Sequence, residues 1–439
     1  MTFDVIVVGG GITGLVTAFY LNRFEKKTLL LEASGRFGGN IRTYRGEKYI
    51  FEEGPQTILA NNPAVWRLIE DLNLEVEKAS PSSEKRFIYK GEQLIPIPLK
   101  PWEFFFTPLV GFKSKLSLLK ELFVKPSQKE DESVAEFVRR HFGEEFLTYF
   151  VQPFVSGIYA GDAEKLSVRY GFPKLWEMEK RYGSLLKAFL KEKRVAPKGE
   201  LISFKGGLLT LVETLTEKIP NKETNTTVLS IEKTKKGTYK VISKKGVFET
   251  RSVVITAPAI ETAQMLKRLF PPIEILKTIE YPSVAVASLS FPKIGVEGFG
   301  LLVSKVERLK ILGTIFVSSL FPNRCPEGED CFSVFLCGET RKEVCQQSEE
   351  QILKTAVREL RKVFPTLGEP KFQKLRLWKR SIPQYTVGYG KIYQTLEELK
   401  IQYPNVEVIS NFVGGSSLAK CIEKGFNTAK RLAGNCKTS

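Results

Sequence analysis

A glycine-rich loop near the amino terminus is the first feature of this sequence that could do chemistry. Gly9, Gly11 and Gly14 form the pattern G-x-G-x-x-G directly after the β-branched run 4–8. Such a loop lets backbone approach a pyrophosphate, and the helix after it presents unpaired N–H groups to the phosphates. Glu32 follows a second predicted strand at the spacing of about 20 residues where a carboxylate binds ribose hydroxyls. The sequence therefore predicts a site for FAD or NAD formed by Gly9, Gly10, Gly11, Ile12, Thr13, Gly14 and Glu32.

The composition excludes several kinds of catalysis. The chain has 439 residues but one histidine, His141, so a Ser-His-Asp triad or a multi-histidine metal site lacks partners. His141 lies in a predicted helix that opens with a Ser133/Glu136 capping box, and we interpret it as structural. We therefore predict no metal site and no side-chain nucleophile, and we expect a cofactor to carry the chemistry.

Length and hydropathy indicate a globular protein of two or three domains. Hydrophobic residues make up 42% and charged residues 26% of the chain. No stretch reaches the roughly 18 apolar residues of a membrane-spanning helix. We expect no signal peptide, because Met1 leads straight into the first predicted strand.

The net charge and the cysteines limit the binding partners and the cellular compartment that we expect. The net charge of +17 suits nucleic acid, an anionic membrane or an acidic small molecule, but we find no nucleic-acid-binding motif. The six cysteines contain no C-x-x-C pair. We predict a reducing compartment and buried thiols rather than disulfides or a metal cluster. The buried thiols in question are Cys325, Cys331, Cys337 and Cys345, and the other two cysteines are Cys421 and Cys436.

Five further segments resemble the two-dinucleotide flavoproteins of the amine oxidase superfamily. They are residues 32–42, 53–57, 204–208, 226–231 and 411–418. The resemblance implies that a backbone at Val228 meets adenine and that Arg36 neutralises the pyrophosphate. It also implies that a helix from about Lys420 faces the flavin, where its dipole stabilises the reduced anion. The cofactor is then FAD, noncovalent because residues 409–418 contain no cysteine, on Ala33, Arg36, Gly39, Asn40, Gly54, Pro55, Gln56, Thr57, Val228, Ser416, Ser417 and Leu418.

The middle of the chain is similar to the oxygen-dependent, flavin-containing protoporphyrinogen oxidases. The matching segments are 150–168, 298–303, 312–324 and 382–385, and the matches run from residue 3 to about 430. The resemblance implies an enzyme of haem biosynthesis that oxidises a porphyrinogen to a porphyrin. Six electrons then leave in three two-electron steps, and oxygen reoxidises the FAD with release of hydrogen peroxide.

Five residues carry over as substrate contacts from this resemblance. Arg86 matches an arginine that pairs with a propionate, a task that suits its bidentate fork. Leu302, Ile315 and Phe335 fall at positions that sandwich pyrrole rings. The backbone carbonyl of Gly157, in a predicted glycine-bearing loop, is a hypothetical polarising group. We find no general base.

A proline- and aromatic-rich stretch, residues 95–125, has the composition of a membrane-surface segment. Apolar residues recur at helical spacing from Phe112 to Phe123, with lysines between them, as anionic membranes require. A helix packed on its own domain would show the same pattern. The resemblance favours membrane contact, because this family has its membrane-binding domain in the corresponding stretch. The residues concerned are Pro96, Pro98, Pro101, Pro108, Trp102, Phe104, Phe105, Phe106, Phe112, Leu116, Leu119, Leu122, Phe123, Lys113, Lys115 and Lys120.

We therefore predict an α/β fold with a discontinuous Rossmann-type FAD-binding domain, a mixed-sheet substrate domain and a helical membrane-binding insertion. The FAD domain comprises 1–80, 200–261 and 391–439, the helical domain 87–182, and the substrate domain 183–199 and 262–390. The expected partners are a porphyrinogen, molecular oxygen and a membrane surface, with a homodimer left open and no nucleic acid. The expected location is cytoplasmic and peripheral to the membrane.

Three alternative functions remain open at this point. Coproporphyrinogen III oxidation uses the same chemistry on a substrate with four propionates, although Arg86 favours the two-propionate substrate. An amine oxidase is a more distant possibility. The last is a flavin- or porphyrin-binding protein without turnover.

Overall fold

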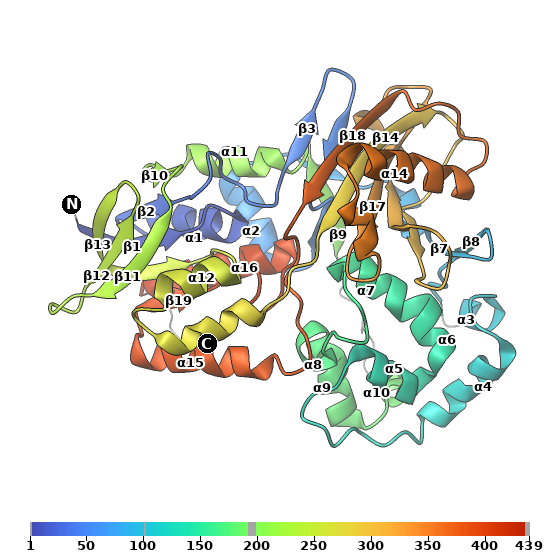
Figure 1. The fold of residues 1–439 in the computed structure, drawn as a ribbon, viewed down its shortest axis with the longest axis horizontal. Helices are drawn as coiled ribbons and strands as arrows, with labels where there is room; N and C mark the ends of the chain where they lie inside the picture. Colours follow the sequence, from blue (N-terminus) through green and yellow to red (C-terminus); the bar gives the residue numbers. More distant parts are fainter. Residues whose placement is uncertain (1, 101, 192–198, 435–439) are drawn as a thin grey trace.

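The computed structural model describes residues 2–100, 102–191 and 199–434. Pro101, Cys436 and parts of the predicted domains at 1, 192–198 and 435–439 lie outside the described residues. The described residues form a mixed α/β fold with two seven-stranded sheets and two small sheets (Figure 1).

The amino-terminal strand is an interior strand of the first sheet, and its β-branched residues are buried on both faces. Val5 and Val7 belong to one hydrophobic cluster, together with helices α1 and α16, while Ile6 and Val8 belong to another. Strands β10, β2, β1, β13 and β19 run parallel, and β12 and β11 continue the sheet antiparallel. The bounds are β1 Thr2–Val8, β2 Thr28–Leu31, β10 Lys222–Glu223, β11 Val228–Lys233, β12 Tyr239–Ser243, β13 Gly246–Ile255, β19 Val406–Val408, α1 Ile12–Arg23 and α16 Leu418–Leu432.

The second sheet is mixed and has the order β18-β14-β17-β16-β15-β7-β8. Helix α14 covers one face, with Ile352, Ala356 and Leu360 in its hydrophobic cluster. The bounds are β7 Arg86–Lys90, β8 Gln93–Pro96, β14 Val284–Pro292, β15 Gly300–Val303, β16 Ile311–Phe316, β17 Glu329–Cys337, β18 Phe372–Trp378 and α14 Glu349–Val363.

Two small sheets join the large ones. They are β3 (Thr43–Arg45) with β4 (Ile50–Glu52), and β5 (Ile58–Ala60), β9 (Glu200–Phe204) and β6 (Val76–Lys78). Buried Arg324 ties them to the second sheet, with ion pairs of 3.3 Å to Glu52 and 2.9 Å to Glu77. Burial raises the pKa of Glu52 to about 7, although Arg324 opposes the shift.

The helical segment lies below the second sheet in Figure 1. It comprises α3 Glu103–Phe106, α4 Phe112–Glu121, α5 Val134–Phe142, α6 Glu144–Phe146, a π-helical turn Leu147–Val151, α7 Gln152–Tyr159, α8 Val168–Gly171, α9 Pro173–Tyr182 and α10 Leu185–Lys191. Before this segment, β7 pairs with β15 and β8 pairs with β7 in the second sheet, and at its end α10 packs on α9.

The remaining helices connect these layers. They are α2 Pro63–Leu72, α11 Leu209–Glu217, α12 Ala259–Leu266, α13 Val317–Leu320 and α15 Gly390–Gln402, with short 3-10 turns at Pro81–Glu84, Pro271–Thr278, Pro322–Arg324 and Lys342–Gln346. Within the described ranges, none of the helices has the length and apolar character needed to span a bilayer.

The prediction of free thiols was wrong for four cysteines. Cys325 is bonded to Cys331, and Cys337 to Cys345, with Cα–Cα distances of 6.1 Å and 5.5 Å. The reason is geometric, because β17 brings Cys331 and Cys337 within bonding range of the loops before and after it. Sequence spacing alone does not reveal this approach. Cys421 is free and buried.

His141 lies in a buried ionic cluster, which agrees with the structural role expected for it. The capping box of Ser133 and Glu136 opens its helix as predicted. Its Nδ1 is 2.7 Å from Glu121 Oε1 and its Nε2 is 3.0 Å from Glu179 Oε1. Burial disfavours the imidazolium, but hydrogen bonds to both carboxylates outweigh it and raise the pKa of His141 above 6.5.

The same cluster fastens α4 to the other helices. Glu121, the last residue of α4, also accepts hydrogen bonds from Ser184 Oγ at 2.5 Å and from Leu185 N at 2.6 Å, at the start of α10. Burial would raise the pKa of Glu121 and Glu179, but hydrogen bonds from His141 together with those from Ser184, Leu185 and Leu186 to Glu121, and from Arg140 to Glu179, outweigh burial and lower both pKa values below 4.5. Helix α4, which begins at the exposed Phe112, is thus held in place by the buried carboxylate of Glu121.

We expect Glu121→Gln to destabilise the protein by about 3–5 kcal/mol, because it leaves His141 without one of its two counter-charges. Denaturant unfolding near pH 6, followed by circular dichroism, measures the loss. The matched control is Glu350→Gln, which removes an exposed ion pair with Lys354 and should change the stability little, because solvent screens an exposed pair.

The loss should also depend on pH. His141 stabilises the fold fully below pH 6.5, and this contribution disappears as the pH rises through its raised pKa. Glu121 and Glu179 contribute above pH 4.5, and their contribution disappears as the pH falls through their lowered pKa values. The difference in unfolding free energy between wild type and Glu121→Gln is therefore largest between pH 4.5 and pH 6.5. Equal unfolding free energies for Glu121→Gln and Glu350→Gln would contradict the assignment.

Candidate functional site

One continuous cavity of about 1520 Å³ extends from the strand ends of the first sheet to the face of the second sheet. Its wall includes parts of α1, α7, α8, α9 and α16. It brings together residues that lie hundreds of positions apart in the sequence. The predicted site residues that line it are Gly9, Gly10, Gly11, Ile12, Thr13, Glu32, Ala33, Gly39, Asn40, Gly54, Pro55, Gln56, Thr57, Val228, Ser416, Ser417, Leu418, Arg86, Gly157, Leu302, Ile315 and Phe335.

The glycine loop has the geometry that close backbone approach requires. Gly9 has a positive φ of 110°, which glycine adopts without strain. A Cβ on Gly14 would lie 1.9 Å from the Gly9 carbonyl oxygen, so only glycine lets α1 pack there. A Cβ on Gly11 would meet nothing within 4 Å. Helix α1 begins at Ile12 without a side-chain cap, so its first N–H groups remain available.

Glu32 lies at the end of β2, where its carboxylate is fixed by hydrogen bonds. Its Oε2 accepts from Gly10 N at 2.6 Å, and its Oε1 accepts from Ser34 N at 2.8 Å and Ser34 Oγ at 2.7 Å. A carboxylate accepts about four hydrogen bonds, so Glu32 keeps capacity for a further donor from the cavity.

Two predicted residues lie behind the cavity wall instead of in it. Gly14 is enclosed by the glycine loop, and Arg36 donates hydrogen bonds to the carbonyls of Phe37 at 3.1 Å and Ile41 at 3.0 Å. Burial lowers the pKa of Arg36, and neighbouring Arg42 adds to the shift. In this structure Arg36 braces the loop whose next glycines line the cavity.

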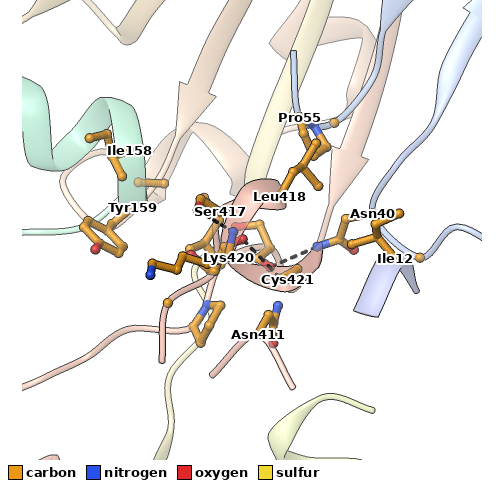
Figure 2. A pocket seen from close by; sticks show the side chains of 18 of the residues that line it. Ile12, Asn40, Pro55, Ile158, Tyr159, Asn411, Ser417, Leu418, Lys420 and Cys421 are labelled. Carbon is orange, nitrogen blue, oxygen red and sulfur yellow. Dashed lines mark hydrogen bonds between the residues drawn. The ribbon is translucent and has the colours of Figure 1, made fainter. Parts of the chain in front are cut away.

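The start of α16 projects into the middle of the cavity. Figure 2 shows Ser417 and Leu418 between Ile158 of α7 on one side and Asn40 on the other. The helix begins at Leu418, slightly before the predicted Lys420, because the Ser417 side chain accepts from Lys420 N at 3.3 Å. The amino-terminal end of its dipole therefore faces the cavity.

The second sheet forms the opposite wall. Leu302, Ile315 and Phe335 come from the adjacent strands β15, β16 and β17, and all three line the cavity. Leu301 and Val334 alternate with them and are buried on the side of α14. The period of two along each strand thus separates cavity residues from core residues.

Gly157 lies in α7, whereas we predicted a loop. A Cβ there would lie 2.6 Å from Leu302 Cδ2, so glycine lets the helix approach the sheet. Proline at the start of a helix and β-branched residues within it obscured this helix in the sequence. Gly157 is in the last turn of α7, where carbonyls lack partners within the helix.

Arg86 lines the same end of the cavity, at the start of β7. Its guanidinium carbon lies 4.8 Å from the ring centre of Phe299, and burial lowers its pKa. Among the described residues, no carboxylate forms an ion pair with it. Such a guanidinium, exposed at the cavity, has the chemistry to bind an anion.

Sequence reasoning missed several cavity residues. Trp378 donates from Nε1 to the Glu53 carbonyl at 2.6 Å and covers the loop at Gly54. Cys421 lies just after the segment that was searched for a flavin-linking cysteine, yet its position on α16 brings it to the cavity wall. The segment 382–385 resembles a known family, but we predicted no site residue in it. The missed residues are Asn411, Tyr281, Trp378, Arg380, Ile382, Pro383, Tyr393 and Cys421.

The side chains and backbone groups present fit a flavin dinucleotide. Open space at Gly11 beside the first turn of α1 suits a pyrophosphate, and the fixed carboxylate of Glu32 suits a ribose. The amino terminus of α16 suits the electron-rich end of a flavin ring. The apolar wall of the second sheet leaves room for a flat substrate beside it.

Three comparisons with known proteins agree with this fit. Residues 12–433 match the family described as flavin-containing amine oxidoreductases. The chain is 30% identical to the chloroplastic protoporphyrinogen oxidase 1 of Spinacia oleracea, over 98% of this chain and 84% of that protein. It is 31% identical to the coproporphyrinogen III oxidase of Bacillus subtilis (strain 168), over 96% of each. A candidate protoporphyrinogen oxidase from Exiguobacterium sp. 255-15 has a similar crystal structure, with a TM-score of 0.84, 25% identity and 99% coverage of both chains.

We expect Gly11→Ala to fold normally but to bind a flavin dinucleotide at least about 10-fold more weakly, because the new methyl group occupies the space proposed for the pyrophosphate. Flavin titration of apo-protein, with thermal unfolding alongside, measures both properties. Gly368→Ala is the matched control, since its Cβ would make only ordinary contact at 3.4 Å and lies outside the cavity. Equal affinities for the two variants would place the dinucleotide elsewhere.

Proposed function

Because this chain belongs to the flavin-containing amine oxidoreductases, and is therefore an oxidoreductase that uses a flavin, we propose that it oxidises protoporphyrinogen IX to protoporphyrin IX. The cofactor is FAD, held noncovalently, and oxygen is the final acceptor, with hydrogen peroxide as the second product. The observation that carries the proposal is the single cavity, which joins a dinucleotide-type loop to an apolar wall that ends at an arginine.

The names of the relatives support this substrate class. Chloroplastic relatives from several plants are named protoporphyrinogen oxidases, and two bacterial relatives are named coproporphyrinogen III oxidases. All of them match this chain over at least 96% of its length. A porphyrinogen is therefore the substrate that these names have in common.

FAD, when bound, supplies the hydride acceptor for each two-electron step. The protein then has to position a flat, apolar macrocycle and exclude water from it. Leu302, Ile315 and Phe335 provide an apolar surface for the pyrrole rings. The carbonyl of Gly157, at the end of α7, is placed to polarise a C–H or N–H group of the substrate. No step in this scheme needs a histidine.

Arg86 fixes the orientation of the macrocycle by pairing with a propionate. Its guanidinium has no carboxylate partner among the described residues, and although Arg86 is exposed at the cavity, partial desolvation lowers its pKa. A propionate would compensate that charge with two parallel hydrogen bonds. The ring is then fixed at one edge, with its face directed along the apolar wall.

Coproporphyrinogen III oxidation is the second candidate, because the Bacillus subtilis relative has this name and matches over 96% of both chains. Its substrate has four propionates. Arg169 of α8 also lines the cavity and could hold one of the additional carboxylates. We favour the two-propionate substrate because the other cavity cations, Arg380 and Lys420, are already paired with Glu261 and Glu423.

Oxygen consumption with each porphyrinogen, together with porphyrin fluorescence, tests the proposal. We expect three oxygen molecules consumed per protoporphyrin formed, since each takes up two of six electrons. Faster turnover of coproporphyrinogen III would support the second candidate. Turnover of an amine alone would refute both, and FAD binding without any turnover would indicate a carrier.

We expect Arg86→Ala to raise KM for the porphyrinogen about 10- to 150-fold, because a lost charge-assisted pair costs about 1.5–3 kcal/mol. FAD content should stay the same, since Arg86 lies at the other end of the cavity. Steady-state kinetics and the flavin-to-protein ratio measure the two effects. Lys85→Ala, at an exposed neighbouring position outside the cavity, should leave KM unchanged. An unchanged KM for Arg86→Ala would remove Arg86 from the substrate site.

We also propose that the enzyme docks peripherally on the cytoplasmic side of an anionic membrane through α3, α4 and their flanks. Large apolar side chains are exposed there, with Phe106 82%, Phe112 74% and Phe123 85% exposed. Phe104 instead stacks internally on Phe146. Lys113 and Lys120 are exposed in the same segment, and the side chain of Leu119 lies outside the described residues. Porphyrins are flat and poorly soluble in water, so a lipid surface is a favourable place for the enzyme to bind and release them.

We expect the triple substitution Phe106→Ser, Phe112→Ser and Leu116→Ser to abolish co-sedimentation with anionic vesicles while FAD content stays normal. For the wild type, salt should weaken binding without abolishing it, because each basic residue near the surface contributes about 1 kcal/mol. Val306→Ser with Ile401→Ser, two exposed apolar residues elsewhere, serves as the control. Sedimentation of the triple variant at the wild-type level would show that this segment is not the membrane contact.

A further inference from the structure

The loop between β19 and α16 is held by side chains that no step of the proposed reaction uses. Ser410, Asn411, Gly414 and Gly415 of this loop line the cavity. We call residues 410–415 the site loop. The loop has few side chains that could fix it, and two of its glycines, Gly414 and Gly415, have positive φ values of 67° and 100°.

Three tyrosines, spaced four residues apart, bind the backbone of the site loop. Tyr385 donates its hydroxyl to the Asn411 carbonyl at 2.6 Å, and Tyr389 donates to the Phe412 carbonyl at 2.8 Å. Tyr393, one turn further along α15, accepts from Gly414 N at 2.9 Å. Their rings also contact one another, with centroids 5.0 Å and 5.9 Å apart.

Lys424 binds the remaining carbonyls from the opposite side. Its ammonium donates to the carbonyls of Ser410 at 2.7 Å, Gly415 at 2.9 Å and also Val413. An ammonium has three donors, so these three carbonyls satisfy it completely. Every residue of the site loop is therefore held by one of four side chains.

Burial keeps the two tyrosine contacts in one protonation state over most of the pH range. Tyr385 and Tyr389 are almost completely buried, and burial raises the pKa of both hydroxyls, so they stay protonated and donate. Burial lowers the pKa of Lys424, but its three carbonyl partners suit the charged form.

We propose that Tyr385, Tyr389, Tyr393 and Lys424 form a clamp that positions the site loop for the flavin. The proposal rests on the proposed cofactor site. With its carbonyls bound by the clamp, the site loop leads directly into the amino terminus of α16, which lines the cavity where the flavin ring is proposed. The clamp also puts the positive charge of Lys424 one hydrogen bond behind the cavity wall. Tyr385, Tyr389 and Lys424 are thus positioning residues, because they lie outside the cavity and act through the loop.

FAD titration of apo-protein and the flavin midpoint potential, measured on single variants, test the clamp. We expect Tyr389→Phe to raise the Kd for FAD about 10-fold, because a loop carbonyl loses its donor. Lys424→Met should raise the Kd by at least as much and should also lower the midpoint potential, since the reduced anion loses a nearby cation. Tyr389→Phe changes no charge, so its potential should stay at the wild-type value.

Two matched controls separate positioning from folding. Tyr403→Phe removes a hydroxyl that also donates to a backbone carbonyl, that of Leu269, outside the cavity. Lys430→Met makes the same change as Lys424→Met on an exposed turn of the same helix. Both should leave the Kd and the potential unchanged.

The outcomes are distinct. Loss of thermal stability in Tyr389→Phe and Lys424→Met with unchanged Kd and potential overturns the proposal and leaves the clamp a structural feature. If Lys424→Met does not fold, Tyr385→Phe replaces it in the affinity test, and an unchanged Kd there overturns the proposal equally. If the wild type binds no FAD, the proposed function fails rather than the clamp alone.

Discussion

The close approach of helices α1 and α16 is the constraint on which the rest of the site depends. A Cβ on Gly425 of α16 would lie 2.8 Å from the Thr13 carbonyl of α1, and a Cβ on Gly14 would collide with the Gly9 carbonyl. Glycine at 425 therefore lets α16 approach α1, and glycine at 14 lets α1 pack against the glycine loop, so the amino termini of both helices line one cavity. Their dipoles add there, so the protein offers positive potential at two points without a metal ion or a buried cation in the wall. We infer that one point serves the pyrophosphate and the other the flavin ring.

The opposite wall of the cavity is formed by apolar side chains rather than by helix amino termini. The second sheet offers apolar side chains at alternate positions, and α7 can approach them because Gly157 has no Cβ. Charged groups on this side are few, and Arg86 and Arg169 both lack an ion-pair partner among the described side chains. A cavity with polar backbone at one end and an apolar slot with two unpaired cations at the other suits a dinucleotide next to a flat, hydrophobic acid.

The sequence predicted those parts that depend on local pattern. The strand, glycine loop, helix and second strand up to Glu32 are where we expected them, because each is specified by neighbouring residues. The capping box at Ser133 was predicted for the same reason. The helix at Gly157 was missed because its glycine and proline are typical of a loop. The sequence does not show that the second sheet packs against this helix.

Features that depend on distant residues could not be predicted. The disulfides need β17 to bring Cys331 and Cys337 close to neighbouring loops. The partners of His141 come from α4 and α9, and the hydroxyl of Tyr385 reaches a carbonyl 26 residues away. Nothing in the local sequence indicates which acid or carbonyl a buried donor will meet.

The central claim is that the two ends of one cavity bring a flavin and a porphyrinogen into direct contact. The most direct test mixes the purified flavoprotein with protoporphyrinogen IX in the absence of oxygen and follows the visible absorption of the oxidised flavin. The account predicts that this absorption is lost in a single turnover and returns when oxygen is admitted. Retention of the oxidised spectrum while the porphyrinogen is bound would contradict it.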